Sequence, residues 1–533
     1  MIRTLNHYWK HPLIYWPSVI ITAAATPLTF APYYWFWLMP LLFAILIHLT
    51  ELRPERSFQT AYLFGLVGYT AQFYWIHTAL HDISGLSDLF ALPLTLLFPA
   101  YLALYPAACF WLLKKFHLPR SLKIGLALPV LWTLTEFARE RFLTGFGWGA
   151  LGYSQITKDS PLAGFAPLGG IHLVTFATAL IGAWLLLMFA RSKSPQRRLI
   201  PLCLSLLLCI VGYTAQNTEF TRPDGSTRTV ALIQGNIEQT LKWDSDQTFP
   251  TIQKYYEHIG RTTADLVILP ETAIPAMRQN LPENVLTNLA DQSQKNGSAL
   301  AVGIAQYTPD GNHYENVVIN LSNYNNSASN EIPYYAKNHL VPFGEYKPLP
   351  FITEPLYRMM NMPLSDMKKG GEGQAPLQMK DQKVAFNICY EDGFGDDLIA
   401  TAKQSTLLAN SSNMAWYGDS NAMYQQQQQS QARAMELGRY MVRATNTGAT
   451  SIISPQGSIV AQAEPNTETV LEGHIKGYTG ETPYMKMGSS WPLIGVLTAL
   501  AALLFLLGRF ALHLTKTQTA APAAEDETEA TEN

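Results

Sequence analysis

An apolar run gives way to polar residues in the stretch Val384-Ala385-Phe386-Asn387-Ile388-Cys389-Tyr390-Glu391-Asp392. A short apolar run bounded by polar residues predicts a buried β-strand that ends beside Cys389. The thiol then lies where the strand turns and its end becomes exposed. Catalytic groups often occupy such positions, because loops at strand ends are held by a rigid scaffold.

Two other segments have a similar character. The apolar run Asp265–Leu269 leads directly to Glu271, so a carboxylate stands at a second strand end. The polar loop Tyr335–Glu345 follows a further predicted strand and contains Lys337. These segments supply an acid, an amine and a thiol in comparable places.

From Arg228 onward, short apolar runs alternate with helical stretches, which is typical of a layered α/β domain. Strands are predicted at Thr229–Gln234, Leu266–Leu269, Ala299–Ile304, Asn316–Leu321, Val384–Cys389, Thr406–Asn410, Thr450–Ile453 and Val460–Ala463. Helices are predicted at Pro250–Thr263, Glu283–Lys295 and Ala422–Ala444, the last of which includes the run Gln425–Gln429.

The chain has four cysteines. Cys109, Cys203 and Cys209 lie in or beside apolar runs long enough to enter a membrane, so Cys389 is alone in the α/β domain and can form no disulfide within it. A lone thiol in an oxidising compartment suggests reactivity. A buried, inert cysteine is the alternative.

Glu271, Lys337 and Cys389 together form a chemically complete set for acyl transfer. The carboxylate can remove the thiol proton, the ammonium can stabilise the thiolate and the oxyanion, and the sulfur can carry the acyl group. Each residue also has a simpler interpretation, since Glu271 could be a turn acid and Lys337 could form a solvated ion pair with Glu345.

The composition indicates a membrane protein. Charged residues make up 14% of the chain, against about 25% in an average soluble protein, and 48% of the residues are hydrophobic. Eight apolar stretches approach the length that crosses a bilayer. They are roughly Pro12–Pro32, Tyr33–Thr50, Phe58–Ala79, Leu89–Leu113, Ile124–Ala138, Leu168–Ala190, Leu199–Tyr213 and Trp491–Gly508, of which the fifth and seventh are short. Six or nine spans remain alternatives, and a cleaved signal peptide is an alternative for the first stretch.

Basic residues indicate the orientation, because Lys and Arg gather in short cytoplasmic loops. They precede the first span and follow the second, fourth and sixth. This pattern predicts a membrane domain with seven transmembrane helices over residues 1–215, an extracytoplasmic domain over 216–488 and a C-terminal transmembrane helix over 489–516. The acidic segment 517–533 is predicted to be a disordered cytoplasmic tail.

The loop after the fifth span breaks the charge pattern. It combines Arg139 and Arg141 with the aromatic residues Phe142, Phe146, Trp148 and Tyr153. Cations beside interfacial aromatic rings suggest that this loop binds phospholipid headgroups and admits acyl chains. An ordinary aromatic belt at the membrane surface is the alternative.

Several short blocks of the sequence resemble a known family. The blocks Leu269–Thr272, Ala336–Glu345 and Ile388–Glu391 look like the Glu-Lys-Cys signature of the nitrilase, or carbon-nitrogen hydrolase, superfamily. In the version attached to membrane spans, they resemble the apolipoprotein N-acyltransferase family. The resemblance covers nearly the whole chain and includes residues 234–236, 241–244, 415–419, 433–438 and 446–448. One departure is Met414, where we expect an acidic residue.

The resemblance implies an αββα sandwich domain attached to about eight transmembrane helices, in a bacterial inner membrane and with the catalytic domain in the periplasm. The implied reaction moves a fatty acyl chain from a phospholipid, preferably phosphatidylethanolamine, through a cysteine thioester. The acceptor is the α-amino group of the N-terminal S-diacylglyceryl cysteine of apolipoproteins, and this is the final step of lipoprotein maturation. No cofactor is needed, because the phospholipid ester is already an activated acyl group.

The resemblance also implies a role for individual residues. Cys389 would be the nucleophile, Glu271 the general base and Lys337 the oxyanion stabiliser. The supporting residues would be Glu345, Tyr390 and Glu391, with Trp243 on a mobile loop near the entrance and Trp416 as a further possible lipid contact.

Other functions have weaker support in the sequence. A net charge of -3 lacks the basic excess that nucleic-acid binders usually need, so no nucleic-acid partner is expected. The histidines form no metal-binding pattern, and no phosphate-binding glycine loop occurs in a strand-to-helix context. A membrane-tethered amidase, and a transporter or sensor with an inactive nitrilase-like domain, remain alternatives.

Overall fold

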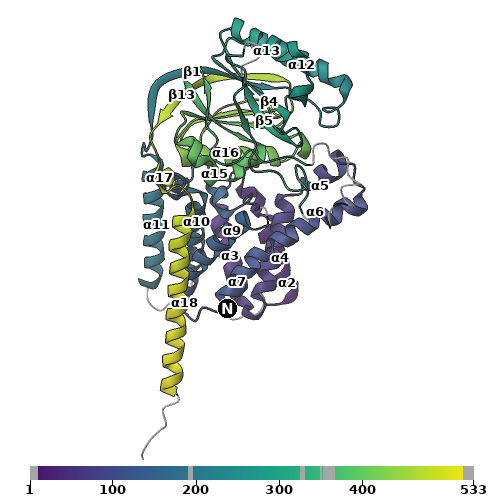
Figure 1. Cartoon of the computed structure of the whole chain (residues 1–533). Coiled ribbons are helices and arrows are strands. Elements are labelled where there is room, and N and C mark those ends of the chain that lie inside the picture. Colours follow the sequence, from purple (N-terminus) through teal and green to yellow (C-terminus); the bar gives the residue numbers. More distant parts are fainter. Residues whose placement is uncertain are drawn as a thin grey trace, which may run out of the picture.

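The computed structural model describes residues 10–143, 145–189, 196–324, 331–348, 351, 354 and 366–519. Figure 1 shows a bundle of apolar helices beneath two packed β-sheets. Helices α15 (Gly395–Ala402) and α16 (Ala422–Leu437) lie between the sheets and the bundle. The long helix α18 (Trp491–Thr519) runs along the bundle and continues beyond it.

Helices occupy each of the eight regions that the sequence predicts as spans. Among the described residues, five helical stretches are long and apolar enough to cross a membrane, namely 88–113, 120–141, 161–189, 198–216 and 491–514, and Leu38–Leu52 is apolar but shorter. A membrane protein is therefore supported, whereas the count of about eight spans is not confirmed. The helices are α2 (Pro12–Ala24), α3 (Leu38–Leu52), α4 (Ser57–Gln72), α6 (Asp88–Leu102), α7 (Leu104–Leu113), α9 (Leu128–Arg141), α10 (Ala166–Phe189), α11 (Gln196–Gln216) and α18.

The two spans that look short in the sequence gain length from flanking residues. The fifth extends over Arg120–Arg141 and the seventh over Arg198–Gln216. The 22 residues of the fifth correspond to about 33 Å of helix, which covers a hydrocarbon core of about 30 Å. The last helix continues to Thr519, past the predicted end at residue 516, and the rest of the predicted tail, 520–533, lies outside the described residues.

The first sheet contains the strands that lead to Glu271 and Lys337. Its order is β13-β1-β2-β4-β5-β6, with β3 paired to β4. Strands β1, β2 and β4 are parallel, and β13, β5 and β6 extend the sheet with antiparallel pairs. The strands are β1 (Arg222–Gln234), β2 (Leu266–Ile268), β3 (Ile274–Met277), β4 (Ala299–Tyr307), β5 (Tyr314–Asn320), β6 (Tyr334–Ala336) and β13 (Thr469–Thr479).

The second sheet contains the strand that leads to Cys389. Its order is β12-β11-β10-β9-β8-β7, and β10, β9 and β8 are parallel. The register pairs Ile388 at the end of β8 with Ser411 on β9. The strands are β7 (Leu377–Met379), β8 (Gln382–Ile388), β9 (Leu407–Ser412), β10 (Met441–Thr445), β11 (Ser451–Ile453) and β12 (Ile459–Gln462).

The two sheets pack face to face and form a four-layer αββα sandwich. Leu232 of β1 and Phe386 of β8 belong to one core between the sheets. Alternate residues point outward, so Ile233 packs under α12 (Ser245–Arg261) and α13 (Glu283–Lys295), while Ala385 packs against α15 and α16. The predicted sandwich is confirmed.

The predicted helix Ala422–Ala444 is wrong in its last seven residues, 438–444. Helix α16 ends at Leu437, because Gly438 adopts a left-handed conformation with φ 60°, and the chain then enters strand β10. The apolar residues Met441 and Val442 therefore lie in the sheet and do not continue the helix. The sequence analysis also missed the strands β3, β6, β7 and β13.

The glutamine run Gln425–Gln429 lies fully inside the protein, because α16 has the second sheet on one side and the helix bundle on the other. Neighbouring glutamines meet different partners. Gln425 accepts from Trp148 Nε1 at 3.1 Å, Gln426 accepts from Arg443, Gln427 donates to Gln462 at 2.9 Å, and Gln428 donates to the Ile156 carbonyl at 3.2 Å. The run is thus a set of specific contacts between layers.

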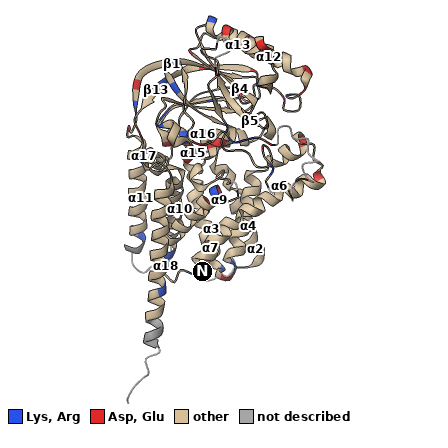
Figure 2. Cartoon of the chain, viewed as in Figure 1, with Lys and Arg blue, Asp and Glu red and all other residues tan. Residues whose placement is uncertain are grey.

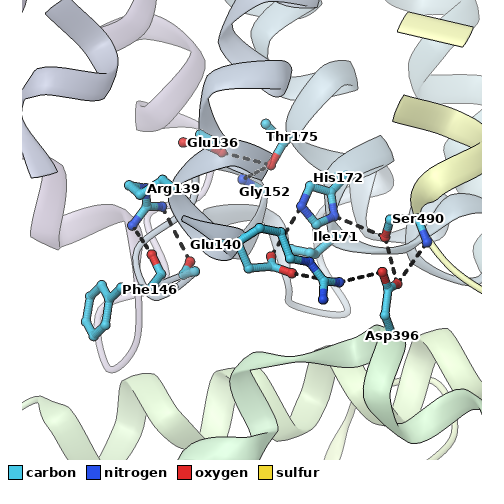
Figure 3. A network of polar contacts seen from close by, with 12 residues as sticks. Glu136, Arg139, Glu140, Phe146, Gly152, Ile171, His172, Thr175, Asp396 and Ser490 are labelled. Atoms are coloured by element: carbon cyan, nitrogen blue, oxygen red, sulfur yellow. Dashed lines mark hydrogen bonds and ion pairs between the residues drawn. The ribbon is translucent and has the colours of Figure 1, made fainter. Parts of the chain in front are cut away.

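Charged residues gather on the sandwich, and few lie on the membrane helices (Figure 2). The exceptions at the junction of the two parts are paired, and they are buried or only partly exposed. The Arg141 guanidinium lies 2.5 Å from the Asp396 carboxylate, and His172 Nε2 lies 3.2 Å from Glu140. Figure 3 shows this network at the end of the bundle that meets the sandwich.

Asp396 connects the sandwich to three separate parts of the chain. Besides Arg141 on α9, it accepts hydrogen bonds from the Tyr484 hydroxyl at 2.6 Å and from the Ser490 hydroxyl at 2.8 Å. Removing Asp396 takes away the nearest partner of Arg141, which keeps only longer contacts with Glu140 at 3.5 Å and Asp397 at 4.0 Å, and it leaves the Tyr484 and Ser490 hydroxyls without their acceptor.

We predict that Asp396→Ala lowers the free energy of unfolding by about 3 kcal/mol. Thermal unfolding of the purified protein in detergent, followed by tryptophan fluorescence, measures the effect as a lower Tm. The matched control is Asp381→Ala, whose partner Arg228 sits at an exposed surface. Equal shifts in the two variants would contradict a special role for the junction.

Candidate active site

Three ionisable side chains from the first sheet meet at one point. Lys337, which follows β6, places its Nζ 2.6 Å from Glu345 Oε1 and 3.4 Å from Glu271 Oε1. All three side chains are largely buried, with exposures of 1%, 13% and 8% respectively. Burial disfavours the charged lysine, but the two carboxylates outweigh this effect and raise the pKa of Lys337 well above its usual value.

Cys389 comes from the second sheet and lies near Glu271 and Lys337, whose charges act on its thiol. It follows β8 directly and has φ 54°, a left-handed conformation that a non-glycine residue rarely adopts. Burial and the charge of Glu271 raise the pKa of the Cys389 thiol to about 11, while Lys337 lowers it in part. The resting thiol is therefore protonated at neutral pH and needs a base to become a nucleophile.

Polar side chains of the second sheet hold the turn at Cys389. Asn410 Nδ2 donates to the Cys389 carbonyl at 3.3 Å, and Gln426 Nε2 lies 3.8 Å from the sulfur. Arg443 donates to Gln426 and forms a buried ion pair with Asp392 at 2.9 Å. These contacts fix an unusual backbone conformation that would otherwise relax.

Glu271 accepts hydrogen bonds both at its carboxylate and at its main-chain carbonyl. Asn316 Nδ2 on β5 donates to Glu271 Oε1 at 2.7 Å, and Lys242 Nζ donates to the Glu271 carbonyl at 3.1 Å. The neighbouring strand β4 comes so near that a Cβ at Gly303 would lie 2.1 Å from the Pro270 carbonyl oxygen. Only glycine fits at that position without moving the turn.

Glu391 joins the loop of Lys337 to the strand of Cys389. Its carboxylate accepts hydrogen bonds from the main-chain N–H groups of Asn338, His339 and Ile388 at 2.6–2.9 Å and from the Tyr335 hydroxyl. A carboxylate with this many donors sets the position of each segment relative to the others. Glu345 has a similar effect within the loop, since it accepts from the Val341 N–H at 2.8 Å.

Tyr390 extends from the site toward the helix bundle. Its hydroxyl donates to the Gly145 carbonyl at 2.9 Å, and its ring stacks near Phe146. Gly145 has φ 78°, and a Cβ there would lie 1.8 Å from the Glu140 carbonyl oxygen, so the loop can turn here only with glycine. The residue after Cys389 is thus tied to the loop that follows α9.

Arg139 shapes this loop from inside the protein. Its guanidinium donates to the main-chain carbonyls of Phe146 at 2.7 Å and Trp148 at 2.8 Å, and Figure 3 shows Arg139 directed at the Phe146 carbonyl. The Arg139 side chain is buried. Its observed contacts are therefore with the protein, and so is the ion pair between Arg141 and Asp396.

The predicted lipid contacts fall into two groups in the structure. Arg139, Trp148 and Tyr153 are buried, whereas Phe146 and Trp416 are partly exposed. The exposed apolar side chains of the loop are Phe142 and Leu143, at 63% and 62% exposure; Phe142 is one of the aromatic residues noted in the sequence, whereas Leu143 is not. Lipid binding by the predicted residues stays a prediction, but packing is the observed role of the buried ones.

An apolar cluster connects the site with the membrane helices. Tyr390 and Phe394 from the sandwich pack together with Phe73 and Trp75 from the bundle. Met414, where the family pattern predicts an acid, is 1% exposed in the same cluster, so an apolar residue suits this environment. The cluster offers a lipid-like surface next to Cys389.

Three residues near the site were missed by the sequence analysis. Tyr417 packs edge-on against Trp75 at 4.6 Å, and burial together with the charge of Cys389 raises its pKa. Asn316 and Lys242 contact Glu271, as described above. A polar Asn at the start of an apolar strand and a Lys between Leu241 and Trp243 were the only signals, and neither reveals a partner far along the chain. Trp243 itself is half-buried in the turn before α12.

Within the described residues, no group of three or more His, Cys, Asp or Glu side chains is arranged to hold a metal ion. The chemistry on offer is that of the side chains themselves. A thiol beside a carboxylate and an ammonium can form a thiolate, attack a carbonyl and carry the acyl group. An apolar surface next to such a thiol suits an acyl chain.

Comparisons with known proteins agree with this geometry. Residues 229–484 match the carbon-nitrogen hydrolase family, and residues 22–184 match the apolipoprotein N-acyltransferase N-terminal domain. The apolipoprotein N-acyltransferases of Neisseria meningitidis serogroups A and B are each 72% identical over 95% of this chain and 99% of theirs. That of Chromobacterium violaceum is 47% identical over 92% of this chain and 93% of its own. The chain therefore belongs to the apolipoprotein N-acyltransferase family.

Proposed function

We propose that the protein transfers a fatty acyl chain from a phospholipid to the α-amino group of the N-terminal S-diacylglyceryl cysteine of apolipoproteins. The observation that carries this proposal is the buried contact of Lys337 with both Glu271 and Glu345 beside the Cys389 thiol. The family membership supports the same reaction. The proposed site lies on the periplasmic side of a bacterial inner membrane.

In the first half-reaction, Glu271 accepts the Cys389 proton while the sulfur attacks the ester carbonyl of the phospholipid. The negative charge that develops on the carbonyl oxygen is stabilised by the Lys337 ammonium. The C–O bond then breaks, the proton passes from Glu271 to the leaving alkoxide, and a lysophospholipid departs. The acyl chain remains on Cys389 as a thioester.

In the second half-reaction, the α-amino group of the acceptor cysteine attacks the thioester. Glu271 accepts a proton from the attacking amine, the C–S bond breaks, and the proton returns to the sulfur. The products are an amide and the free Cys389 thiol. The same base therefore serves both halves of a ping-pong cycle.

The apolar cluster around Tyr390 supports a lipid substrate. It lies between the sandwich and the bundle, where an acyl chain can stay in an apolar environment while its carbonyl reaches Cys389. Such an environment also limits the access of water, which would hydrolyse the thioester. Water as the acceptor would make the protein an amidase or esterase, and the experiment below separates these outcomes.

We predict that the purified protein, incubated with phosphatidylethanolamine, gains one fatty acyl mass on Cys389 that hydroxylamine removes. Added diacylglyceryl-cysteine peptide should then receive the acyl group on its amine. Mass spectrometry of the protein and of the peptide measures both steps, and Cys389→Ala abolishes both.

The alternatives give different results in this experiment. An adduct that disappears without acylating the peptide indicates a hydrolase. Absence of any adduct in a protein with an unchanged Tm overturns the proposed acyl transfer.

We further predict that Asn316→Ala slows acylation of Cys389 about tenfold or more, because Glu271 loses a charge-assisted hydrogen bond that orients it. The rate of adduct formation in a single turnover measures the effect. Asn320→Ala is the control, since Asn320 lies on the same strand and donates to the main-chain carbonyl of Gln378 at 2.7 Å. Equal slowing in both variants would point to a general loss of strand stability.

A further inference from the structure

Lys242 is a second lysine at the site, and the proposed roles leave it unused. Its side chain is 2% exposed, in the turn that precedes α12 and beside Trp243. Nζ donates to the main-chain carbonyl of Glu271 at 3.1 Å. Among the described residues, no carboxylate forms an ion pair with it. An ammonium group buried in this way is costly and needs a reason.

The surroundings of Lys242 are negative. Burial lowers the pKa of Lys242 to about 8, and the charges of Glu271 and Cys389 act in the opposite direction and favour its ammonium form. Such an interaction is mutual, so a charged Lys242 favours the carboxylate of Glu271 and the thiolate of Cys389.

The charge balance of the site explains why a second ammonium group would be useful there. Lys337 is already matched by two carboxylates, Glu271 and Glu345. With both carboxylates ionised the site therefore carries an excess of negative charge, and this excess remains when the proton moves from Cys389 to Glu271 and the negative charge appears on the sulfur or on a carbonyl oxygen bound to it. A second ammonium compensates for that excess without competing for the same carboxylates.

The turn that carries Lys242 is anchored at its other end. Asn446 bonds both the N–H and the carbonyl of Ile237, at 3.0 and 2.8 Å, and Asn413 donates to Gln239 at 2.7 Å. Lys242 is the contact that joins the last part of this turn to Glu271.

We propose that Lys242 is a positioning residue of the acyl-transfer site, which ties the turn before Trp243 to the main chain of Glu271 and contributes positive charge that favours the Cys389 thiolate. The consequence of this role for acyl transfer rests on the proposed function. The effect of Lys242 on the Cys389 thiol does not rest on it, and the experiment below measures the reactivity of that thiol directly.

The experiment follows alkylation of Cys389 by iodoacetamide from pH 7 to pH 10 in the full chain, with the Cys389 peptide quantified by mass spectrometry. Lys242→Met should slow alkylation about three- to tenfold at pH 7, which corresponds to a rise of half to one unit in the thiol pKa, and the difference should shrink toward pH 10 as Lys242 loses its own proton. Lys242→Arg should restore most of the rate. Lys254→Met is the matched control, because Lys254 donates to the Gly235 carbonyl at 3.3 Å but pairs with Glu468.

A second variant separates charge from hydrogen bonding. Lys242→Gln keeps a donor and loses the charge, so it should slow alkylation as Lys242→Met does. A wild-type rate in Lys242→Gln, or slowing of Lys242→Met by the same factor at pH 7 and at pH 10, overturns the charge contribution. If the wild-type protein forms no acyl adduct with phosphatidylethanolamine while the alkylation effect persists, the proposed function fails and the inference on Lys242 stands.

Discussion

The contact of the Lys337 ammonium with two buried carboxylates is the constraint on which the site depends. Three charged groups leave water together, which is tolerable only if their geometry is maintained from several directions. Glu391 helps to maintain it by accepting hydrogen bonds from main-chain N–H groups of both sheets, and Asn316 donates to the same Glu271 oxygen, Oε1, that Lys337 contacts. The sandwich thus serves as a rigid frame for one electrostatic arrangement, and Cys389 is added to it from the opposite sheet.

The frame continues into the helix bundle. Tyr390 reaches the loop that Arg139 holds, and Asp396 joins α9 to the segment before α18. An enzyme that takes its acyl donor from a bilayer must keep its nucleophile at a fixed height above the lipid. The buried pairs at the junction meet that requirement, because neither part can shift without exposing or separating its charges.

Much of the fold and the central residues could be predicted from the sequence, since apolar runs mark strands and spans, and the residues after strands 266–268 and 382–388 stood out by type. The rest could not be predicted, for different physical reasons. The helix predicted to continue to residue 444 stops at Gly438, which the apolar pattern of Met441 and Val442 concealed. Arg139 was predicted as a lipid contact because it is a cation beside aromatic residues. Its observed partners are the main-chain carbonyls of Phe146 and Trp148, and a main-chain carbonyl leaves no signal in the sequence. Lys242 lies in the block 241–244 of the family resemblance, but its contact could not be predicted, because its partner is the backbone of Glu271.

The glutamine run in α16 looks like a low-complexity tract in the sequence, but in the structure it is buried and makes specific contacts. Tracts of one residue often change in length without harm where they lie in solvent. Here one added residue would rotate everything after it by about 100°, since an α-helix has 3.6 residues per turn. Ser430 and Arg433, which follow the run and contact Asp392, would then face the wrong layers. The tract is therefore a fixed-length spacer, and its length is as much a part of the structure as any single side chain.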